Sequence, residues 1–183
     1  MTRNWTAGLM VFTACALIAP NAAAGALDWK SANWRLELMG WNGLDTGDGD
    51  RSEDWGSTDT VEYEVPLGSH FAFGLRAAPL FYYDQDNNDD DMWGVGFGPT
   101  LRLYSKADEQ RGFFGELGLT ALYHSEKFTG NGSDLNFVSE LGVGYKFKRE
   151  WHIALKWRHI SNAGIDEDNS GANAIGLGLG YSF

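Results

Sequence analysis

The last ten residues of the chain alternate strictly between large apolar and small side chains. One set comprises Ile175, Leu177, Leu179, Tyr181 and Phe183, and the other Ala174, Gly176, Gly178, Gly180 and Ser182. Successive side chains of a β-strand point to opposite faces of the sheet. The segment therefore predicts a strand with one apolar face and one nearly bare face, and not a helix with a single apolar stripe.

The same alternation recurs along the chain and predicts an even number of strands. The eight segments that show it are 33–41, 58–66, 69–83, 92–105, 111–125, 134–148, 150–162 and 172–183. In the seventh, Trp151, Ile153, Leu155 and Trp157 alternate with His152, Ala154, Lys156 and Arg158. An even count permits a closed antiparallel barrel, in which the charged side chains of this segment would face inward.

Alternation alone does not separate a membrane barrel from a soluble β-sandwich, which would bury the apolar face instead. Several segments have the roughly ten residues that a tilted strand needs to cross a bilayer, and the terminal Phe183 resembles the assembly signal of bacterial outer-membrane proteins. Longer acidic connections (42–57, 84–91, 126–133 and 163–171) alternate with mostly short ones. We therefore predict an all-β, eight-stranded antiparallel transmembrane β-barrel with short periplasmic turns and longer extracellular loops.

The N-terminus has the three parts of a secretory signal peptide. Arg3 lies in a short basic region, an apolar stretch runs from Ala7 to Ala19, and small residues follow at 22–26. We expect a signal peptide over 1–24, cleaved between 24 and 26, and the barrel over 27–183. Cys15, the single cysteine, belongs to the leader, so disulfides, thiolate metal sites and cysteine nucleophiles are excluded from the mature protein.

The charge balance argues against nucleic acid as a partner. Without Arg3, 13 basic residues face 25 acidic ones, a net charge near −12. The acids concentrate in two runs, 45–54 and 84–91, which predict solvated loops or loose binding of divalent cations at a lipopolysaccharide layer. No metal site is expected, because His70, His124 and His152 lie on separate segments.

His159 and Ser161 stand two residues apart near the end of the seventh segment. With short turns on the periplasmic side, this segment runs outward and ends at the cell surface. Both residues share the parity of Trp157, which places them on the lipid-facing side near the outer leaflet. Polar side chains there are costly unless they are used, so the pair is a candidate base and nucleophile.

These residues carry a resemblance to a known family. The motif consists of the run His159-Ile160-Ser161-Asn162-Ala163-Gly164 followed by Asn169, Gly171 and Asn173, with Leu135-Asn136-Phe137 and 142–147 upstream. It resembles the signature of the outer-membrane lipid A 3-O-deacylases (the PagL family), eight-stranded barrels that remove an ester-linked acyl chain. The similarity covers roughly the last fifty residues, and before Gly112 only general barrel character is evident.

The resemblance implies a role for each matching residue. The catalytic base would be His159 and the nucleophile Ser161, with Asn169 and the backbone N–H groups of Ala163 and Gly164 stabilising an oxyanion. Phe137 would line the acyl-chain groove, and Asn162 is a second candidate for substrate binding. The acidic third member of the family's triad falls on Asn173, so a carboxylate could instead come from the loop acids 166–168.

The function that follows is an outer-membrane serine esterase that removes the 3-position hydroxyacyl chain of lipid A, without a cofactor. The expected partners are lipopolysaccharide and the outer membrane, and the sequence leaves a homodimer open. A structural or adhesive barrel, including a catalytically silent relative with Asn173 in place of the acid, is the main alternative. A soluble periplasmic sandwich is the third.

Overall fold

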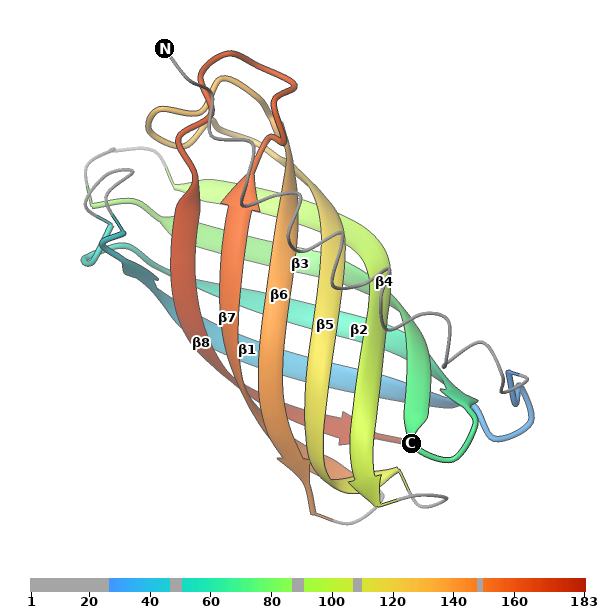
Figure 1. Ribbon diagram of the computed structural model, residues 1–183. Coiled ribbons are helices and arrows are strands. Elements are labelled where there is room, and N and C mark those ends of the chain that lie inside the picture. Colours follow the sequence, from blue (N-terminus) through green and yellow to red (C-terminus); the bar gives the residue numbers. More distant parts are fainter. Residues whose placement is uncertain (1–26, 47–50, 87–90, 107–109, 148–149) are drawn as a thin grey trace.

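The described residues form a closed antiparallel β-barrel (Figure 1). The computed structural model describes residues 27–46, 51–86, 91–106, 110–147 and 150–183, so the predicted signal peptide lies outside them. The strands are β1 (Asn33–Leu44), β2 (Trp55–Leu67), β3 (Phe71–Asp84), β4 (Met92–Lys106), β5 (Arg111–His124), β6 (Leu135–Lys146), β7 (Trp151–Ser161) and β8 (Ala172–Ser182). The prediction of eight strands is confirmed, with ends within about three residues of those expected.

The barrel closes by pairing its first and last strands. β1 and β8 are antiparallel neighbours from Arg35↔Ser182 to Leu44↔Asn173. Just beyond, Phe183 and Trp34 exchange two backbone hydrogen bonds of 2.9 and 3.0 Å. Closure leaves no open edge, which a sheet in lipid requires because hydrocarbon offers backbone groups no hydrogen-bond partner.

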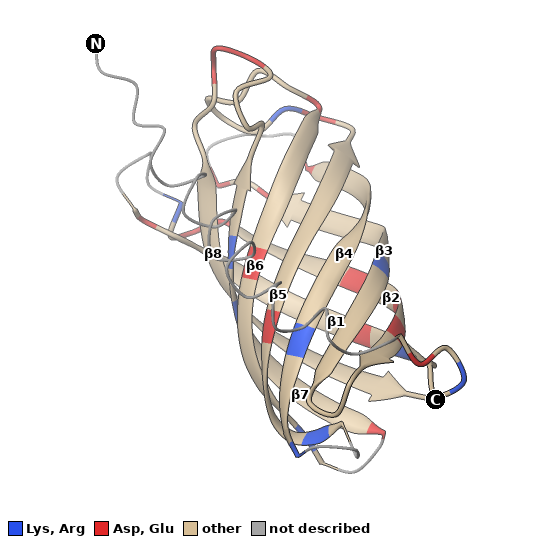
Figure 2. Cartoon of the chain, turned by 45° about the vertical axis from the view of Figure 1, so that its right-hand side comes forward, with Lys and Arg blue, Asp and Glu red and all other residues tan. Residues whose placement is uncertain are grey.

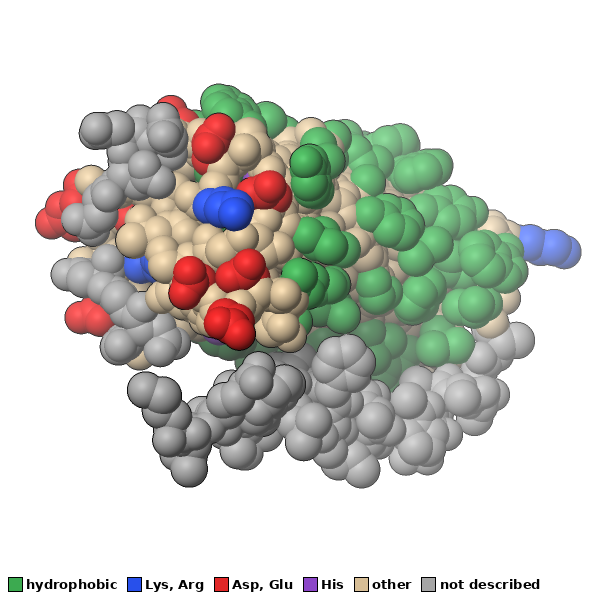
Figure 3. Space-filling model, turned by 90° about the horizontal axis from the view of Figure 1, so that it is seen from above, with side chains coloured by type: hydrophobic (Ala, Val, Ile, Leu, Met, Phe, Trp, Pro, Cys, Tyr) green, Lys and Arg blue, Asp and Glu red, His purple; other side chains and the backbone are tan. Residues whose placement is uncertain are grey.

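The apolar face of the strands points outward and the charged face inward. Along β7, Trp151, Ile153, Leu155 and Trp157 are 37–51% exposed, whereas His152, Lys156 and Arg158 are buried. A space-filling view shows the resulting apolar surface beside an end where acidic side chains gather (Figure 3). A soluble sandwich would have the reverse arrangement, so the membrane barrel is confirmed and the sandwich is wrong. Among the described residues, no helix is long and apolar enough to cross a bilayer.

Buried charge pairs occupy the lumen of the barrel, and Figure 2 shows positions along the strands that carry charged residues. Arg76 contacts Glu116 and Glu140 at 2.6 Å each, Arg102 contacts Glu116 at 2.6 Å, and Arg158 contacts Glu140 at 2.7 Å. The sequence predicted that Lys156 and Arg158 face inward, but not that Arg35, Glu37, Glu62, Glu64 and Lys146 would join the same network. Burial removes these groups from water, so each charge depends on its partners.

Buried apolar side chains pack in the lumen on both sides of the ion network, toward either end of the barrel. Eleven buried residues, among them Trp41, Phe81 and Phe128, form a cluster toward the end where the long loops lie, and Tyr104 and Phe114 belong to a smaller one toward the other end. The barrel interior is therefore a packed core. An open channel would require a wider and emptier lumen.

The described parts of four long connections gather at one end of the barrel (Figure 1). We call them L1 (45–54), L2 (85–91), L3 (125–134) and L4 (162–171), and the three connections at the other end are shorter. By the length rule, the long ones are extracellular. Exposed aromatics mark both ends of the apolar wall: Trp55, Trp93 and Tyr123 toward the loops, and Trp34, Phe113, Trp151 and Phe183 toward the turns.

Removing one lumen cation tests the charge network. Arg102→Met deletes the partner of Glu62, Glu64 and Glu116 while keeping much of the side-chain volume. We expect a loss of about 3–5 kcal/mol in the free energy of unfolding, because three buried carboxylates would each lose a close cation while they stay out of water. Urea titration followed by the heat-modifiable gel mobility of the folded barrel measures this, with the exposed Lys106→Met as the control. Equal unfolding midpoints for the two variants would contradict the expectation.

Candidate active site

His159 and Ser161 lie on the outer wall at the extracellular end of β7. Both are partly exposed and point away from the lumen, whereas Ile160 between them points inward and is 1% exposed. Ile160 belongs to the buried apolar cluster near the loops. The packing of Ile160 inside the barrel thus fixes the part of β7 that carries His159 and Ser161. The outward direction of these two residues is the one that the sequence predicted from parity.

Asn173 of β8 contacts the imidazole of His159. The two residues are paired in register across the β7–β8 ladder, and Asn173 Oδ1 lies 3.0 Å from His159 Nδ1. A carbonyl oxygen only accepts hydrogen bonds, so this contact places the proton on Nδ1 and leaves the Nε2 lone pair free to accept one. The hydrogen bond of His159 Nδ1 is therefore made to the Asn173 amide, and not to a carboxylate of residues 166–168.

The imidazole of His159 occupies the space that a side chain at position 171 would need. A Cβ atom at Gly171 would stand 2.6 Å from His159 Cε1. On its other side, the indole of Trp157 is nearly parallel to the imidazole, with an interplanar angle of 16° and ring centroids 6.2 Å apart. Together these neighbours limit the orientations open to His159.

L4 turns sharply directly after Ser161. Ala163 (φ 53°) and Gly164 (φ 83°) are consecutive residues in the left-handed region, where a non-glycine residue is uncommon. Asn169 Oδ1 accepts the Asn162 N–H at 2.9 Å, which returns the distal part of the loop to the end of β7. This bond uses the amide oxygen of Asn169. The NH₂ group of the same side chain is then the group that can donate a hydrogen bond near Ser161.

Two expectations for L4 need correction. Asn162 is 0% exposed: its Nδ2 donates to Asp168 O at 2.9 Å and its Oδ1 accepts the Gly164 N–H at 2.8 Å. Asn162 therefore shapes the loop and has no surface with which to touch a substrate. The Gly164 N–H is used in the same bond, so Ala163 is the better backbone candidate for an oxyanion donor.

L3 supports L4 through contacts that the sequence did not reveal. Asn131 and Asn169 form an isolated antiparallel bridge. Around it, the Gly132 N–H donates to Asp168 O and the Ser170 N–H donates to Gly130 O, both at 2.8 Å. Arg51 of L1 in turn donates to Thr129 O of L3. The position of Asn169 thus depends on loops far away in the sequence, and no local pattern encodes such contacts.

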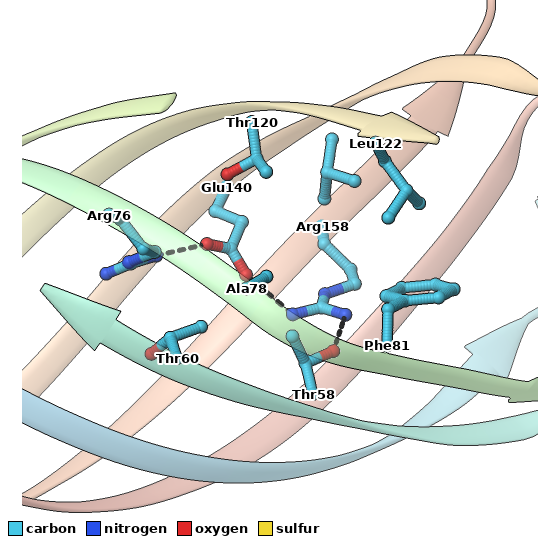
Figure 4. Close-up of a pocket in the computed structure, with 10 residues that line it drawn as sticks. Thr58, Thr60, Arg76, Ala78, Phe81, Thr120, Leu122, Glu140 and Arg158 are labelled. Atoms are coloured by element: carbon cyan, nitrogen blue, oxygen red, sulfur yellow. Dashed lines mark hydrogen bonds and ion pairs between the residues drawn. The ribbon is translucent and has the colours of Figure 1, made fainter. Parts of the chain in front are cut away.

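Phe137 lies beside Ser161 on the membrane face. The two residues are directly paired across β6 and β7, and Leu141 and Ile175 expose 55% and 42% of their surface on the same wall. The pocket drawn in Figure 4 lies instead inside the barrel, where Arg158 contacts Thr58 and Glu140. That pocket faces away from Ser161 and its lining includes the charged Arg76, Glu140 and Arg158, so an acyl chain would lie against the outer wall.

The sequence also showed no sign that Thr46 contacts the site. Thr46 lies in L1, directly before residues 47–50, which are outside the described part of the chain. Asn173 Nδ2 lies 2.8 Å from Thr46 Oγ1. Thr46 is 127 residues from Asn173 in the chain and reaches it only because β1 closes on β8. A single threonine after a strand carries no signal that could have indicated this contact.

The described residues contain no group of three or more His, Cys, Asp or Glu side chains that could hold a metal ion. The two acidic runs fall partly on residues 47–50 and 87–90, outside the described part of the chain. Loose cation binding by these loops, like a homodimer, stays a prediction.

An apolar wall, a packed lumen and a histidine–serine pair facing lipid define the class of protein: an outer-membrane barrel with the elements of an ester hydrolase. The family model of the lipid A 3-O-deacylases (PagL) matches residues 24–182. The chain therefore belongs to the PagL family, and it is a hydrolase of the bacterial outer membrane.

Relatives agree with this assignment, and solved structures agree with the fold. The lipid A deacylase PagL of Bordetella bronchiseptica is 28% identical over 138 residues, which cover 68% of this chain and 75% of the relative. The Pseudomonas aeruginosa protein of the same name is 27% identical over 160 residues, 86% of this chain and 82% of the relative. The crystal structure of the outer membrane enzyme PagL superposes with a TM-score of 0.59 at 21% identity, over 79% of this chain and 97% of that one. Neisserial surface protein A (NspA), at 0.53 and 14% over 83% and 97%, shares the fold alone.

Gly171→Ala tests the placement of the imidazole. The added Cβ would displace the His159 ring, and a misplacement of about 1 Å costs on the order of a hundredfold in rate. We expect activity to fall by about that factor while the barrel still folds, measured as loss of acyl chains from lipid A by mass spectrometry. Gly115→Ala, where an added Cβ meets nothing within 4 Å, is the matched control. Full activity of Gly171→Ala would show that the ring position is not critical.

Proposed function

We propose that this protein hydrolyses the ester that holds the 3-position hydroxyacyl chain of lipid A, with Ser161 as nucleophile and His159 as base. The observation that carries the proposal is the contact of His159 Nδ1 with Asn173 Oδ1, on the strand face that also presents Ser161. This contact leaves Nε2 as the nitrogen able to accept the serine proton. The family membership supplies the substrate class.

The first half of the reaction would transfer the acyl group to the enzyme. Ser161 Oγ attacks the ester carbonyl carbon as its proton moves to His159 Nε2, and the imidazolium keeps its Nδ1–H bond to Asn173. A tetrahedral intermediate forms and then collapses. The sugar hydroxyl leaves with the proton from His159, and the hydroxyacyl chain stays on Ser161.

The second half would release the acyl chain. Water attacks the acyl-enzyme while His159 again takes a proton, and the hydroxy fatty acid leaves with Ser161 restored. In both halves the charge on the carbonyl oxygen needs hydrogen-bond donors. The Asn169 NH₂ group and the Ala163 N–H are the donors we propose, because Ala163 lies two residues after Ser161 and Asn169 is hydrogen-bonded to the Asn162 N–H.

The bilayer would provide the proximity that a soluble enzyme builds as a pocket. The acyl chains of the outer leaflet already lie against the wall that carries Leu141, Ile175 and Phe137. Holding the reacting groups together in this way removes part of the entropic barrier. Phe137, directly opposite Ser161, is placed to contact the chain next to the ester.

Asn173 gives the imidazole an acceptor but no negative charge. In a serine triad, replacing the acid by asparagine costs about four orders of magnitude in turnover, largely because the amide favours the wrong tautomer. Here the oxygen of the amide faces the ring, which is the productive orientation. This orientation favours an active enzyme over a catalytically silent barrel.

Substitution of the pair tests the proposed reaction. Ser161→Ala and His159→Ala should each abolish the loss of one hydroxyacyl group from lipid A, measured by mass spectrometry after expression in an outer membrane with intact lipid A. Ser57→Ala is the matched control, since Ser57 is also a partly exposed strand serine near the extracellular end. Unchanged lipid A in cells that make the folded wild-type protein would refute the proposal.

Asn173→Glu tests the missing charge. A carboxylate beside Nδ1 stabilises the imidazolium that forms as Ser161 attacks, so we expect the rate to rise by about tenfold or more. Asn42→Glu is the matched control, because it adds the same charge to the outward face of β1 opposite Ile175. A rate that falls in Asn173→Glu alone would indicate that the amide has become necessary for this site.

A further inference from the structure

Thr46 extends the hydrogen-bonded chain of the candidate site by one residue. Asn173 Nδ2 lies 2.8 Å from Thr46 Oγ1, and Asn173 Oδ1 lies 3.0 Å from His159 Nδ1. The two ends of one amide group thus hold two different partners. One partner comes from β7, and the other comes from L1 after β1.

An amide differs from a carboxylate because its two ends are not equivalent. Both oxygens of a carboxylate accept hydrogen bonds, whereas an amide has one acceptor and one donor end. If the Asn173 amide turned by 180°, it would present an N–H to His159 Nδ1. The proton of the ring would then sit on Nε2, and His159 could not act as a base toward Ser161.

In this structure the Thr46 hydroxyl accepts the Asn173 Nδ2–H, which matches the orientation with Oδ1 toward the ring. This orientation becomes obligatory when His159 takes the serine proton. Both ring nitrogens then carry protons, and Nδ1 needs an acceptor. Only the orientation with Oδ1 toward the ring and Nδ2–H toward Thr46 satisfies every group in that state.

We propose that Thr46 is a positioning residue that holds the Asn173 amide in its productive orientation, so that the unit acting on the ester is Thr46–Asn173–His159–Ser161. This inference rests on the proposed function of Ser161 and His159. Thr46 itself does not touch the substrate. In this chain it would compensate in part for the absent acid, because a carboxylate at position 173 would need no such partner.

Substitutions at Thr46 should change turnover more than substrate binding. Thr46→Val keeps the shape of the side chain and removes the hydroxyl; we expect kcat to fall about five- to tenfold with KM little changed, since the bond matters most in the transition state. Thr46→Ser should restore most of the loss. Thr129→Val in L3 is the control, because the described hydrogen bonds of Thr129 use only its backbone.

A double substitution separates orientation of the amide from a general effect on L1. In an Asn173→Glu background either carboxylate oxygen can face the ring, so Thr46→Val should cost less than twofold there. The same fold loss in both backgrounds would overturn the proposal, and so would unchanged kcat in the single Thr46→Val variant.

A spectroscopic readout keeps the test independent of activity. Side-chain ¹⁵N NMR of the folded protein in detergent reports the histidine tautomers, and His159→Ala identifies the signal of His159 among the four histidines. We expect the Nδ1–H form in the wild type and a loss of that preference in Thr46→Val. If the wild type is inactive, the proposed function fails, whereas an unchanged tautomer in Thr46→Val refutes the role of Thr46.

Discussion

The hydrocarbon of a bilayer offers backbone groups no hydrogen-bond partner, and the rest of this structure depends on that constraint. The sheet must close, so β1 pairs with β8 from Arg35 to Leu44, and Phe183 is hydrogen-bonded to Trp34. Closure turns one face of every strand toward lipid and the other toward the lumen. It also brings the end of β1 beside the start of β8, where Thr46 meets Asn173.

The lumen charges explain why β7 presents His159 and Ser161 to lipid. Lys156 and Arg158 contact buried glutamates inside the barrel, and residues of the opposite parity must then face outward. A register shift of one residue would reverse every side chain of the strand. It would expose two cations to hydrocarbon and leave the glutamates unpaired, so the ion network and the orientation of the candidate site support each other.

The site needs no enclosed pocket, because its substrate class is already confined to a surface. β7 carries the proposed base and nucleophile, β8 the amide that contacts the imidazole and β6 an aromatic neighbour, all on strands that pack around a filled lumen. The oxyanion candidates lie instead on L4, which is bridged to L3. The parts of the candidate site thus differ in support: the proposed proton-transfer groups lie on barrel strands, and the proposed donors lie on a loop.

The sequence by itself determined the barrel, its strand number and the outward direction of His159 and Ser161, and it placed Asn173 where the family resemblance implies an acid. Period-2 alternation records which face each side chain takes, and that information is local. Only the tertiary structure decided that Asn162 is buried, that L3 braces Asn169 and that Thr46 completes the chain of hydrogen bonds. The last two contacts join segments tens of residues or more apart. All three arise from barrel closure and loop packing, which leave no periodic trace in the sequence.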